Sequence, residues 1–374
     1  MADATQNDRS YSWVRACRVR WRHPNPGGSV ATAQPESAHS RERELTERVS
    51  LTGPDGLLNP AAVGWSRHPL HDTSGIGGRG TRARFRNKRW EYWAFTTPDV
   101  IAAVTIAALD YATMTQVWVY VRATGEAIDR STITPLTRGV VLPGSLGDGR
   151  ASASVPGIEA SVEEIEGGTR ITAHTDRVRV DVVAERPDGH EALGVVVPWS
   201  ARRFQYTVKD VARPAHGTIV VDDQAFDVPA GESWAVLDHG RGRWPYSMRW
   251  HWGAASGVEH GVRLGLQLGG LWTAGTGSTE NAISVDGRLT KLGDELDWRF
   301  DPADHLAPWT ITGTGVDLVF TPFHDRVAKT ALGIVSSETH QCFGTYRGEV
   351  QDVSGATIPI DALLGFAEVV RQRW

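Results

Sequence analysis

Hydrophobic and polar residues alternate along many short segments of this chain. Residues 169–174 and 177–183 alternate in this way and are separated by Thr175-Asp176. Residues 217–221 and 224–228 flank Asp222-Asp223 in the same manner. A period of two places successive side chains on opposite faces of a strand, and a two-residue polar separator is typical of a hairpin turn. Each of these two pairs of segments therefore predicts an antiparallel hairpin.

Further short apolar segments between Gly, Asp and Pro turns extend this pattern over most of the chain. We predict strands at residues 100–108, 116–120, 139–142, 151–155, 160–165, 282–285, 309–311, 316–320 and 341–350. Strands of this length and spacing favour a β sandwich or barrel. One segment, 361–373, is predicted to be a short C-terminal helix, because Leu364, Ala367 and Val370 follow at three-residue spacing and basic residues gather near its end.

The chain has 374 residues, which is long for a single core, so two β domains are expected, at 46–205 and 206–374. Residues 1–45 resemble a linker in composition and are expected to be disordered. A second hypothesis for this segment is that translation starts at Val30. Mass spectrometry of the native N-terminus tests it, and peptides recovered from residues 1–29 would refute it.

Charge and composition narrow the function classes. The formal net charge of -5 provides no general attraction to nucleic acid or to anionic membranes. The chain has no run of about twenty apolar residues, so stable membrane insertion is not expected. Its N-terminus lacks a signal-peptide pattern. Cys17 and Cys342 lie in different contexts and suggest no disulfide framework. A cytoplasmic protein is expected, and the sequence does not indicate its oligomeric state.

The stretch 233–252 combines aromatic and ionisable residues more densely than any other. It contains four of the fifteen tryptophans, together with Asp238 and His239 at the predicted end of a strand. Aromatic walls from Trp234, Trp244 and Trp250 would raise the pKa of a carboxyl and suit it to proton donation near neutral pH. The alternative is structural, with Asp238 anchoring a turn through backbone amides.

Residues 247–255 and 262–268 predict a hairpin with two distinct faces. If the loop 257–261 closes it symmetrically, Trp252 lies opposite Leu266 and His251 lies opposite Gln267. One face is then apolar, and the other carries a polar stripe of Arg249, His251 and Gln267. In a sandwich this stripe faces solvent, whereas in a small barrel it lines a cavity.

Several motifs together resemble an uncharacterised protein family. They are Leu-Asp-His-Gly-Arg-Gly-Arg-Trp-Pro-Tyr at 237–246, Trp-His-Trp-Gly-Ala-Ala-Ser-Gly at 250–257, Ser-Thr-Glu-Asn at 278–281, Ala-Pro-Trp-Thr-Ile at 307–311 and Gly-Phe-Ala-Glu at 365–368 with Arg373-Trp374. The chain resembles the family called domain of unknown function 2804 from about residue 46 onward. The resemblance implies no activity, because none is established for that family.

A more distant similarity concerns Asp238-His239-Gly240 followed by a Trp-x-Trp strand. This pattern is similar to a motif of the hydroxyneurosporene-synthase-like proteins, which include carotenoid 1,2-hydratases. The similarity implies two lipocalin-like (calycin-type) antiparallel β domains with a hydrophobic ligand between or within them. Arg241 stands where that motif usually has Trp, so the similarity bears on the fold more than on hydratase activity.

Two function hypotheses follow. The first is a cofactor-independent hydratase, isomerase or cyclase acting on a hydrophobic small molecule, with Asp238 as the acid, His239 or His251 as its partner, and Glu280 as a second carboxyl. Its candidate ligand-binding residues are Trp234, Arg241, Trp244, Tyr246, Arg249, Trp250, Gln267 and Asn281. No metal-ligand spacing occurs, so no metal or other cofactor is expected. The second hypothesis is a lipocalin-like carrier that binds an isoprenoid or lipid without chemistry.

Overall fold

Antiparallel β strands make up nearly all of the regular secondary structure in the described residues, which confirms the predicted all-β class. The structure is a computed structural model that describes residues 41–77, 86–332 and 335–373. These residues belong to one unit of the chain. The expectations for residues 1–40, disorder and a start at Val30, concern residues outside the described ranges.

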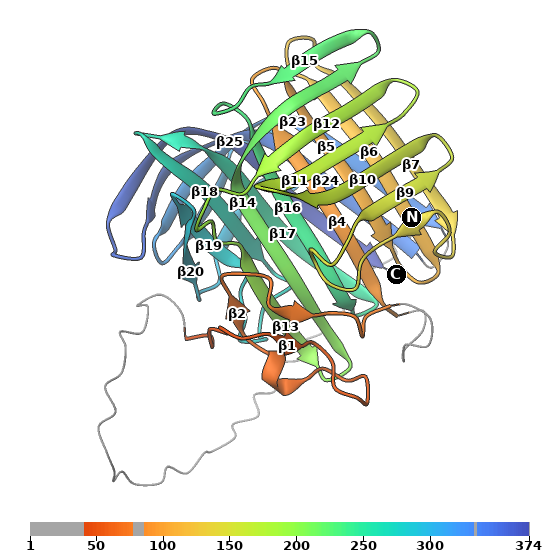
Figure 1. Ribbon diagram of the computed structural model, residues 1–374. Coiled ribbons are helices and arrows are strands. Elements are labelled where there is room, and N and C mark those ends of the chain that lie inside the picture. Colours follow the sequence, from red (N-terminus) through yellow and green to blue (C-terminus); the bar gives the residue numbers. More distant parts are fainter. Residues whose placement is uncertain (1–40, 78–85, 333–334, 374) are drawn as a thin grey trace, which may run out of the picture. The chain divides into compact units, whose positions relative to one another are not determined.

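The first sheet has fourteen strands in the order β7-β6-β5-β4-β16-β14-β12-β11-β10-β9-β8, with β13 and β15 paired to β14 and β2 paired to β13 (Figure 1). Its strands are β2 (Trp65–Ser66), β4 (Lys88–Thr96), β5 (Val100–Ala108), β6 (Ala112–Val121), β7 (Glu126–Pro135), β8 (Val140–Val141), β9 (Ala151–Val155), β10 (Ile158–Ile165), β11 (Gly168–His174), β12 (Val178–Glu185), β13 (Leu193–Ser200), β14 (Arg203–Val221), β15 (Gln224–Val228) and β16 (Trp234–Arg243). Near the start of the chain, β1 (Val49–Ser50) pairs in parallel with β3 (His71–Asp72), and Pro60–Ala62 forms a 3-10 turn.

The second sheet has nine strands in the order β20-β19-β18-β17-β25-β24-β23-β22-β21. Its strands are β17 (Ser247–Glu259), β18 (Val262–Gly270), β19 (Asn281–Val285), β20 (Arg288–Leu292), β21 (Asp297–Arg299), β22 (Trp309–Gly313), β23 (Val316–Leu332), β24 (Val335–Gln351) and β25 (Thr357–Arg373). The chain passes from the first sheet to the second at residues 244–246, and the domain boundary expected near residue 205 falls inside β14.

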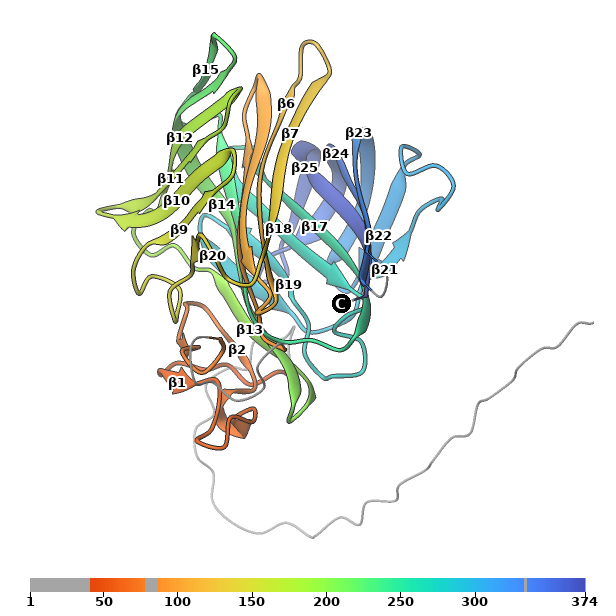
Figure 2. The same cartoon turned by 90° about the vertical axis from the view of Figure 1, so that its right-hand side faces the viewer.

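Each sheet curls around its own apolar core, so the fold consists of two half-barrels (Figure 2). The convex faces meet, because β14 and β16 pack against β17 and β18. Ala94 and Val236 from the first sheet join Trp252, Phe343 and Phe366 from the second in one buried cluster. Strands in the middle of both sheets are therefore buried on both faces.

The predicted C-terminal helix is wrong: this segment is strand β25, which pairs with β17 on one side and β24 on the other. Its residues alternate between the two faces, with Leu363 and Ala367 in the second core and Phe366 in the cluster between the sheets. Because both faces are buried, apolar residues occupy odd and even positions alike. This mixture produced the three-residue spacing that suggested a helix.

The predicted register of the β17–β18 hairpin is also wrong, although the hairpin itself is present. Strand β17 continues to Glu259, so the turn contains only His260 and Gly261, and Trp252 lies opposite Gly269. A shift by an odd number of residues moves a strand's side chains to the other face. Gln267 therefore lies on the face of Trp252, away from Arg249 and His251, and the expected polar stripe does not form.

Both turn residues of this hairpin have left-handed backbone, with φ of 50° at His260 and 82° at Gly261. This is the geometry of a type I′ turn, in which a β-branched residue is strained. Gly261→Val is expected to lower the free energy of unfolding by about 1–3 kcal/mol, measured by urea denaturation. His260→Asn is the matched control and should be neutral or slightly stabilising, because Asn tolerates this conformation. A neutral Gly261→Val variant would contradict the turn assignment.

Candidate functional site

Four ionisable side chains meet between the two sheets: Lys209, Asp238, Glu280 and Glu368, called here the Lys209 cluster. The ammonium of Lys209 lies 3.2 Å from Oδ1 of Asp238 and 3.4 Å from Oε2 of Glu280. It also lies 3.8 Å from the ring centroid of Trp252. One cation thus contacts two carboxyls and an aromatic face in a region shielded from water.

Strand geometry explains why these residues meet. Lys209 on β14 and Asp238 on β16 are direct register partners, so they share the face that packs on the second sheet. Their neighbours Val208 and Leu237 point to the opposite face, into the apolar interior on the first-sheet side. Glu368 enters from β25, and Glu280 immediately precedes β19. The cluster therefore draws on both half-barrels.

Asp238 is the most accessible member of the cluster in contact with Lys209. Its side chain is 14% exposed, whereas those of Lys209 and Glu280 are 6% and 1% exposed. The indole N–H of Trp90 donates to Oδ2 of Asp238 at 2.9 Å, and the hydroxyl of Thr207 donates to Oδ1 at 3.1 Å. These contacts hold the carboxyl in one orientation at the edge of the buried region.

Burial raises the pKa of both glutamates from 4.5 to about 7. Lys209 and a hydrogen bond from Trp272 oppose the effect at Glu280, and Trp250 donates to Oε1 of Glu368 at 2.9 Å. Burial also lowers the pKa of Lys209, but Asp238 and Glu280 outweigh this and raise it overall. The cluster thus holds a charged lysine together with two glutamates whose pKa values lie near neutral pH.

Five indole rings cover this region and form a tryptophan cluster. Trp244 stacks on Trp272 with centroids 5.5 Å apart and an interplanar angle of 7°. It also makes edge contacts with Trp90, Trp199 and Trp250 at centroid distances of 5.4–5.7 Å. Trp90, Trp250 and Trp272 donate their N–H groups to Asp238, Glu368 and Glu280. The rings therefore both wall the site and hold its carboxyls.

Two glycines make this packing possible. A Cβ at Gly240 would lie 2.1 Å from the ring of Trp90, and a Cβ at Gly269 would lie 2.2 Å from Cγ of Glu280. Both distances are far shorter than any van der Waals contact. Glycine is therefore required where the Trp90 ring and the Glu280 side chain cross neighbouring strands.

Of the predicted site residues, the structure brings five together around the Lys209 cluster: Asp238, Glu280, Gln267, Trp244 and Trp250. The amide of Gln267 accepts a hydrogen bond from Trp252 at 2.9 Å and donates to the carbonyl of Glu280 at 3.1 Å. Asn281 is adjacent, where its Oδ1 accepts from the amide of Gly269 at 2.6 Å.

His239 and Arg241 do not join the cluster, because they point to the opposite face of β16. The strand continues to Arg243 rather than ending at His239 as expected. The guanidinium of Arg241 lies 3.1 Å from Oε1 of Glu91, and Nδ1 of His239 lies 3.6 Å from the same oxygen. Burial lowers the pKa of His239 to about 4 and that of Arg241 to about 10.

Four other predicted residues also lie apart. His251 points into the second half-barrel, where it contacts Trp298 and Phe300, and burial lowers its pKa to about 4. Arg249 lines a hollow on that same face. Tyr246 is exposed between β16 and β17, and Trp234 is buried at the far end of β16.

Sequence reasoning missed Lys209, Glu368, Trp90 and Trp272. Lys209 had a signal, since a Lys-Asp pair interrupts the apolar strand Thr207-Val-Lys-Asp-Val211, and buried charges are rare unless paired. Glu368 also had a sequence signal, because it is the single acidic residue in an apolar run. Reading that run as a strand would have assigned Glu368 to one of its two faces. Trp90 reaches Asp238 because β4 pairs with β16, and Trp272 reaches Trp244 and Glu280 from the loop after β18. No local sequence pattern reveals these contacts.

Potential metal-ligand atoms of His305, Asp325 and His340 lie within 4.8 Å of one another in the second half-barrel, away from the Lys209 cluster. The two imidazole rings are stacked, with centroids 4.0 Å apart and an interplanar angle of 11°. A metal ion lies in the plane of each ring that binds it, so parallel stacked rings do not converge on one ion. This arrangement does not fit a preformed metal site.

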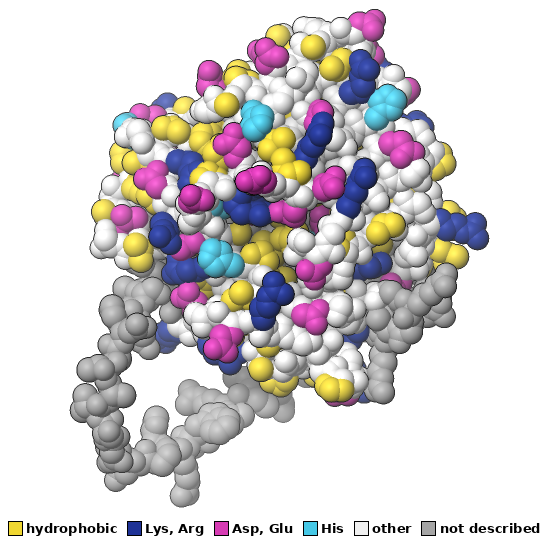
Figure 3. All heavy atoms as spheres, in the orientation of Figure 1, with side chains coloured by type: hydrophobic (Ala, Val, Ile, Leu, Met, Phe, Trp, Pro, Cys, Tyr) yellow, Lys and Arg dark blue, Asp and Glu magenta, His cyan; other side chains and the backbone are white. Residues whose placement is uncertain are grey.

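The surface agrees with the charge balance of the sequence. Figure 3 shows Lys and Arg interspersed with Asp and Glu over one face of the molecule, without the continuous basic track that nucleic acid would need. Within the described ranges, no helix has the length and apolar character needed to cross a membrane.

Two curled antiparallel sheets around separate cores define a protein of lipocalin-like half-barrel architecture. The chain belongs to the family described as "Domain of unknown function (DUF2804)", which it matches over residues 42–374. A search of curated proteins found no match.

Two solved structures with a TM-score of 0.50 share the fold at low sequence identity. A Nitrosomonas europaea protein designated AttH is 11% identical, with a TM-score of 0.50 over 79% of this chain and 98% of that chain. CghA, crystallised with Sch210972, is 9% identical, with a TM-score of 0.50 over 77% of this chain and 88% of that chain. Kievitone hydratase from Nectria haematococca is 12% identical, with a TM-score of 0.46 over 88% of this chain and 97% of that chain.

Proposed function

We propose that this protein is a cofactor-independent enzyme that adds water to, isomerises or cyclises a hydrophobic small molecule by proton transfer. The observation that carries the proposal is the Lys209 cluster, in which a buried lysine and two buried glutamates lie with the partly exposed Asp238 beneath tryptophan rings. Groups with perturbed pKa values and specific partners are typical of catalytic sites. CghA, which has a similar fold, was crystallised with Sch210972, which supports a small-molecule ligand.

In the proposed mechanism, Asp238 exchanges a proton with the substrate, because it is the most accessible carboxyl in contact with Lys209. In a hydration, the acid gives its proton to one carbon of a double bond, water attaches to the other carbon, and the proton released by that water returns to the carboxylate. Lys209 lies between Asp238 and Glu280 and balances the charge that this exchange creates. The faces of the indole rings stabilise positive charge on the substrate.

The carrier hypothesis predicts a dry apolar cavity with the ionisable groups directed to solvent. The described residues place Lys209 and Glu280 at 6% and 1% exposure instead, in contact with each other. Burying several ionisable groups costs desolvation free energy that their mutual pairing offsets only in part, so a purely structural role explains the cluster poorly. This arrangement favours the enzyme, with Lys209 in the partner role expected of His239 or His251.

The proposal is tested by searching for a small molecule that the protein converts to a product. Purified protein is incubated in deuterated water with an apolar extract of its source cells, and products are detected by mass spectrometry as incorporated deuterium or added water. The wild type should convert at least one component, and Asp238→Asn should slow that conversion by about 100-fold, as expected for loss of a general acid.

Asp227→Asn, an exposed carboxyl on β15, is the matched control and should retain the wild-type rate. Thermal melting of each variant establishes that it is folded. A ligand that binds and is recovered unchanged would refute the enzyme and favour the carrier. A conversion whose rate is unaffected by Asp238→Asn would refute the role of Asp238 as the acid.

A further inference from the structure

A hollow of about 480 Å³ lies over the end of the second sheet, on the face opposite the Lys209 cluster. Arg371 lines it, and Arg371 stands three positions from Glu368 on β25, so the two side chains point to opposite faces. The hollow is therefore separate from the proposed catalytic site. Its volume is in the range of small-molecule pockets.

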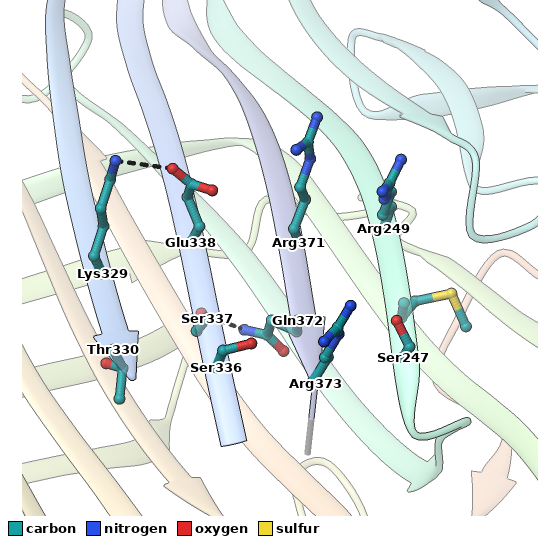
Figure 4. A pocket seen from close by; sticks show the side chains of 11 residues that line it. Ser247, Arg249, Lys329, Thr330, Ser336, Ser337, Glu338, Arg371, Gln372 and Arg373 are labelled. Atoms are coloured by element: carbon teal, nitrogen blue, oxygen red, sulfur yellow. Dashed lines mark hydrogen bonds and ion pairs between the residues drawn. The ribbon is translucent and has the colours of Figure 1, made fainter. Parts of the chain in front are cut away.

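Four neighbouring strands line this hollow, and three of them, β17, β23 and β25, carry basic side chains (Figure 4). Arg371 on β25 lies between two register partners, Arg249 on β17 and Glu338 on β24. Glu338 in turn lies opposite Lys329 on β23. Arg373 follows two positions beyond Arg371 and so shares its face. Register partners share a sheet face, so this row is built by the strand pairing.

The positive charge is not balanced locally. Glu338, the one carboxyl among the lining residues, forms an ion pair with Lys329 at 2.8 Å. Within the part of the chain that the structure describes, Arg249, Arg371 and Arg373 have no carboxylate within ion-pair distance. Arg249 and Arg371 are like charges placed directly opposite one another, which destabilises a sheet. This local cost points to an anion that the guanidinium groups share.

We propose that this hollow binds the phosphate groups of a small phosphorylated molecule. Guanidinium groups donate paired hydrogen bonds that match phosphate oxygens. Ser247, Thr330, Ser336 and Ser337 line the same hollow and add hydroxyl donors. The three arginines not paired with a carboxylate match a group with several negative charges better than a single carboxylate. The proposal is independent of the reaction assigned to the Lys209 cluster.

The test is titration of the full-length protein with inorganic pyrophosphate by isothermal calorimetry at low ionic strength. The wild type should bind one equivalent, and the affinity should fall as salt is raised. Arg371→Gln and Arg249→Gln should each weaken binding at least tenfold. Arg179→Gln, which replaces an exposed arginine on β12, should leave it unchanged.

Melting temperatures separate binding from folding. Without ligand, Arg371→Gln should melt at or above the wild-type temperature, because it removes the opposed like charges. With pyrophosphate, the wild type should gain the larger increase. Citrate serves as a polycarboxylate probe. Equal binding by wild type and Arg371→Gln, tighter binding of citrate than of pyrophosphate, or no saturable binding would overturn the assignment.

Discussion

Trp244→Ala is expected to lower the free energy of unfolding by about 3–5 kcal/mol, the cost typical of removing a large buried aromatic side chain. Trp244 is 7% exposed and contacts all four other rings of the tryptophan cluster. Its N–H also donates to Oε1 of Gln205 at 2.6 Å. Truncation would leave a cavity between the sheets and an unpaired buried amide oxygen.

Urea denaturation measures this effect, and two variants bracket it. Trp244→Phe keeps an aromatic ring but leaves Gln205 without its donor, so it should cost less, about 1–3 kcal/mol. Ile133→Ala removes an exposed side chain on β7 and should change stability by less than about 0.5 kcal/mol. If Trp244→Ala lowered the free energy of unfolding by less than Trp244→Phe, the result would contradict the packing described for the tryptophan cluster.

Glu280→Gln should change how stability depends on pH. Burial raises the pKa of Glu280 from 4.5 to about 7, so between these values the folded state holds a proton that the unfolded state has released. The free energy of unfolding therefore falls as pH rises through this window. The total effect is about 3 kcal/mol, since each pKa unit corresponds to about 1.4 kcal/mol. Glutamine carries no such proton and removes the contribution of Glu280, whereas the contribution of Glu368 remains in both proteins.

The measurement compares denaturation of the wild type and Glu280→Gln at pH 5 and pH 8. Relative to the variant, the wild type should be less stable at pH 8 than at pH 5 by about 2–3 kcal/mol. The buried histidines, with pKa values lowered to about 4, act in the opposite direction below pH 6.5, but they are common to both proteins and cancel. Glu166→Gln, at an exposed position, should follow the wild type. Parallel profiles for wild type and Glu280→Gln would exclude a raised pKa at Glu280.

The sequence predicted local elements well where one strand face is apolar and the turn is short. The predicted strands at 100–108 and 151–155 coincide with β5 and β9, and the turn at Asp222-Asp223 joins β14 and β15 as expected. The prediction failed at β25, because a strand buried on both faces has no period of two. It failed again at the β17–β18 register, because six residues between the predicted strands permit several turn positions and the glycines at 257 and 261 suggested the wrong one.

Only part of the candidate site could be predicted from the sequence, because the faces to which strand residues point were not known. Asp238, Glu280, Trp244 and Trp250 stood out because aromatic and acidic residues recur close together along the chain. Lys209 comes from a strand whose facing could not be assigned before its pairing with β16 was known. His239 was misplaced by a single step of alternation, since adjacent residues on one strand point to opposite faces.

The position of β25 has a consequence for how the molecule reaches its folded state. This strand lies in the middle of the second sheet, yet its partner β17 ends at Glu259 and β25 begins only at Thr357. During synthesis, the edge of β17 stays unpaired while the intervening strands emerge from the ribosome, and contacts so distant in sequence form slowly. An exposed strand edge invites pairing with other chains. We therefore expect slow folding and a nascent chain that depends on chaperones until β25 inserts.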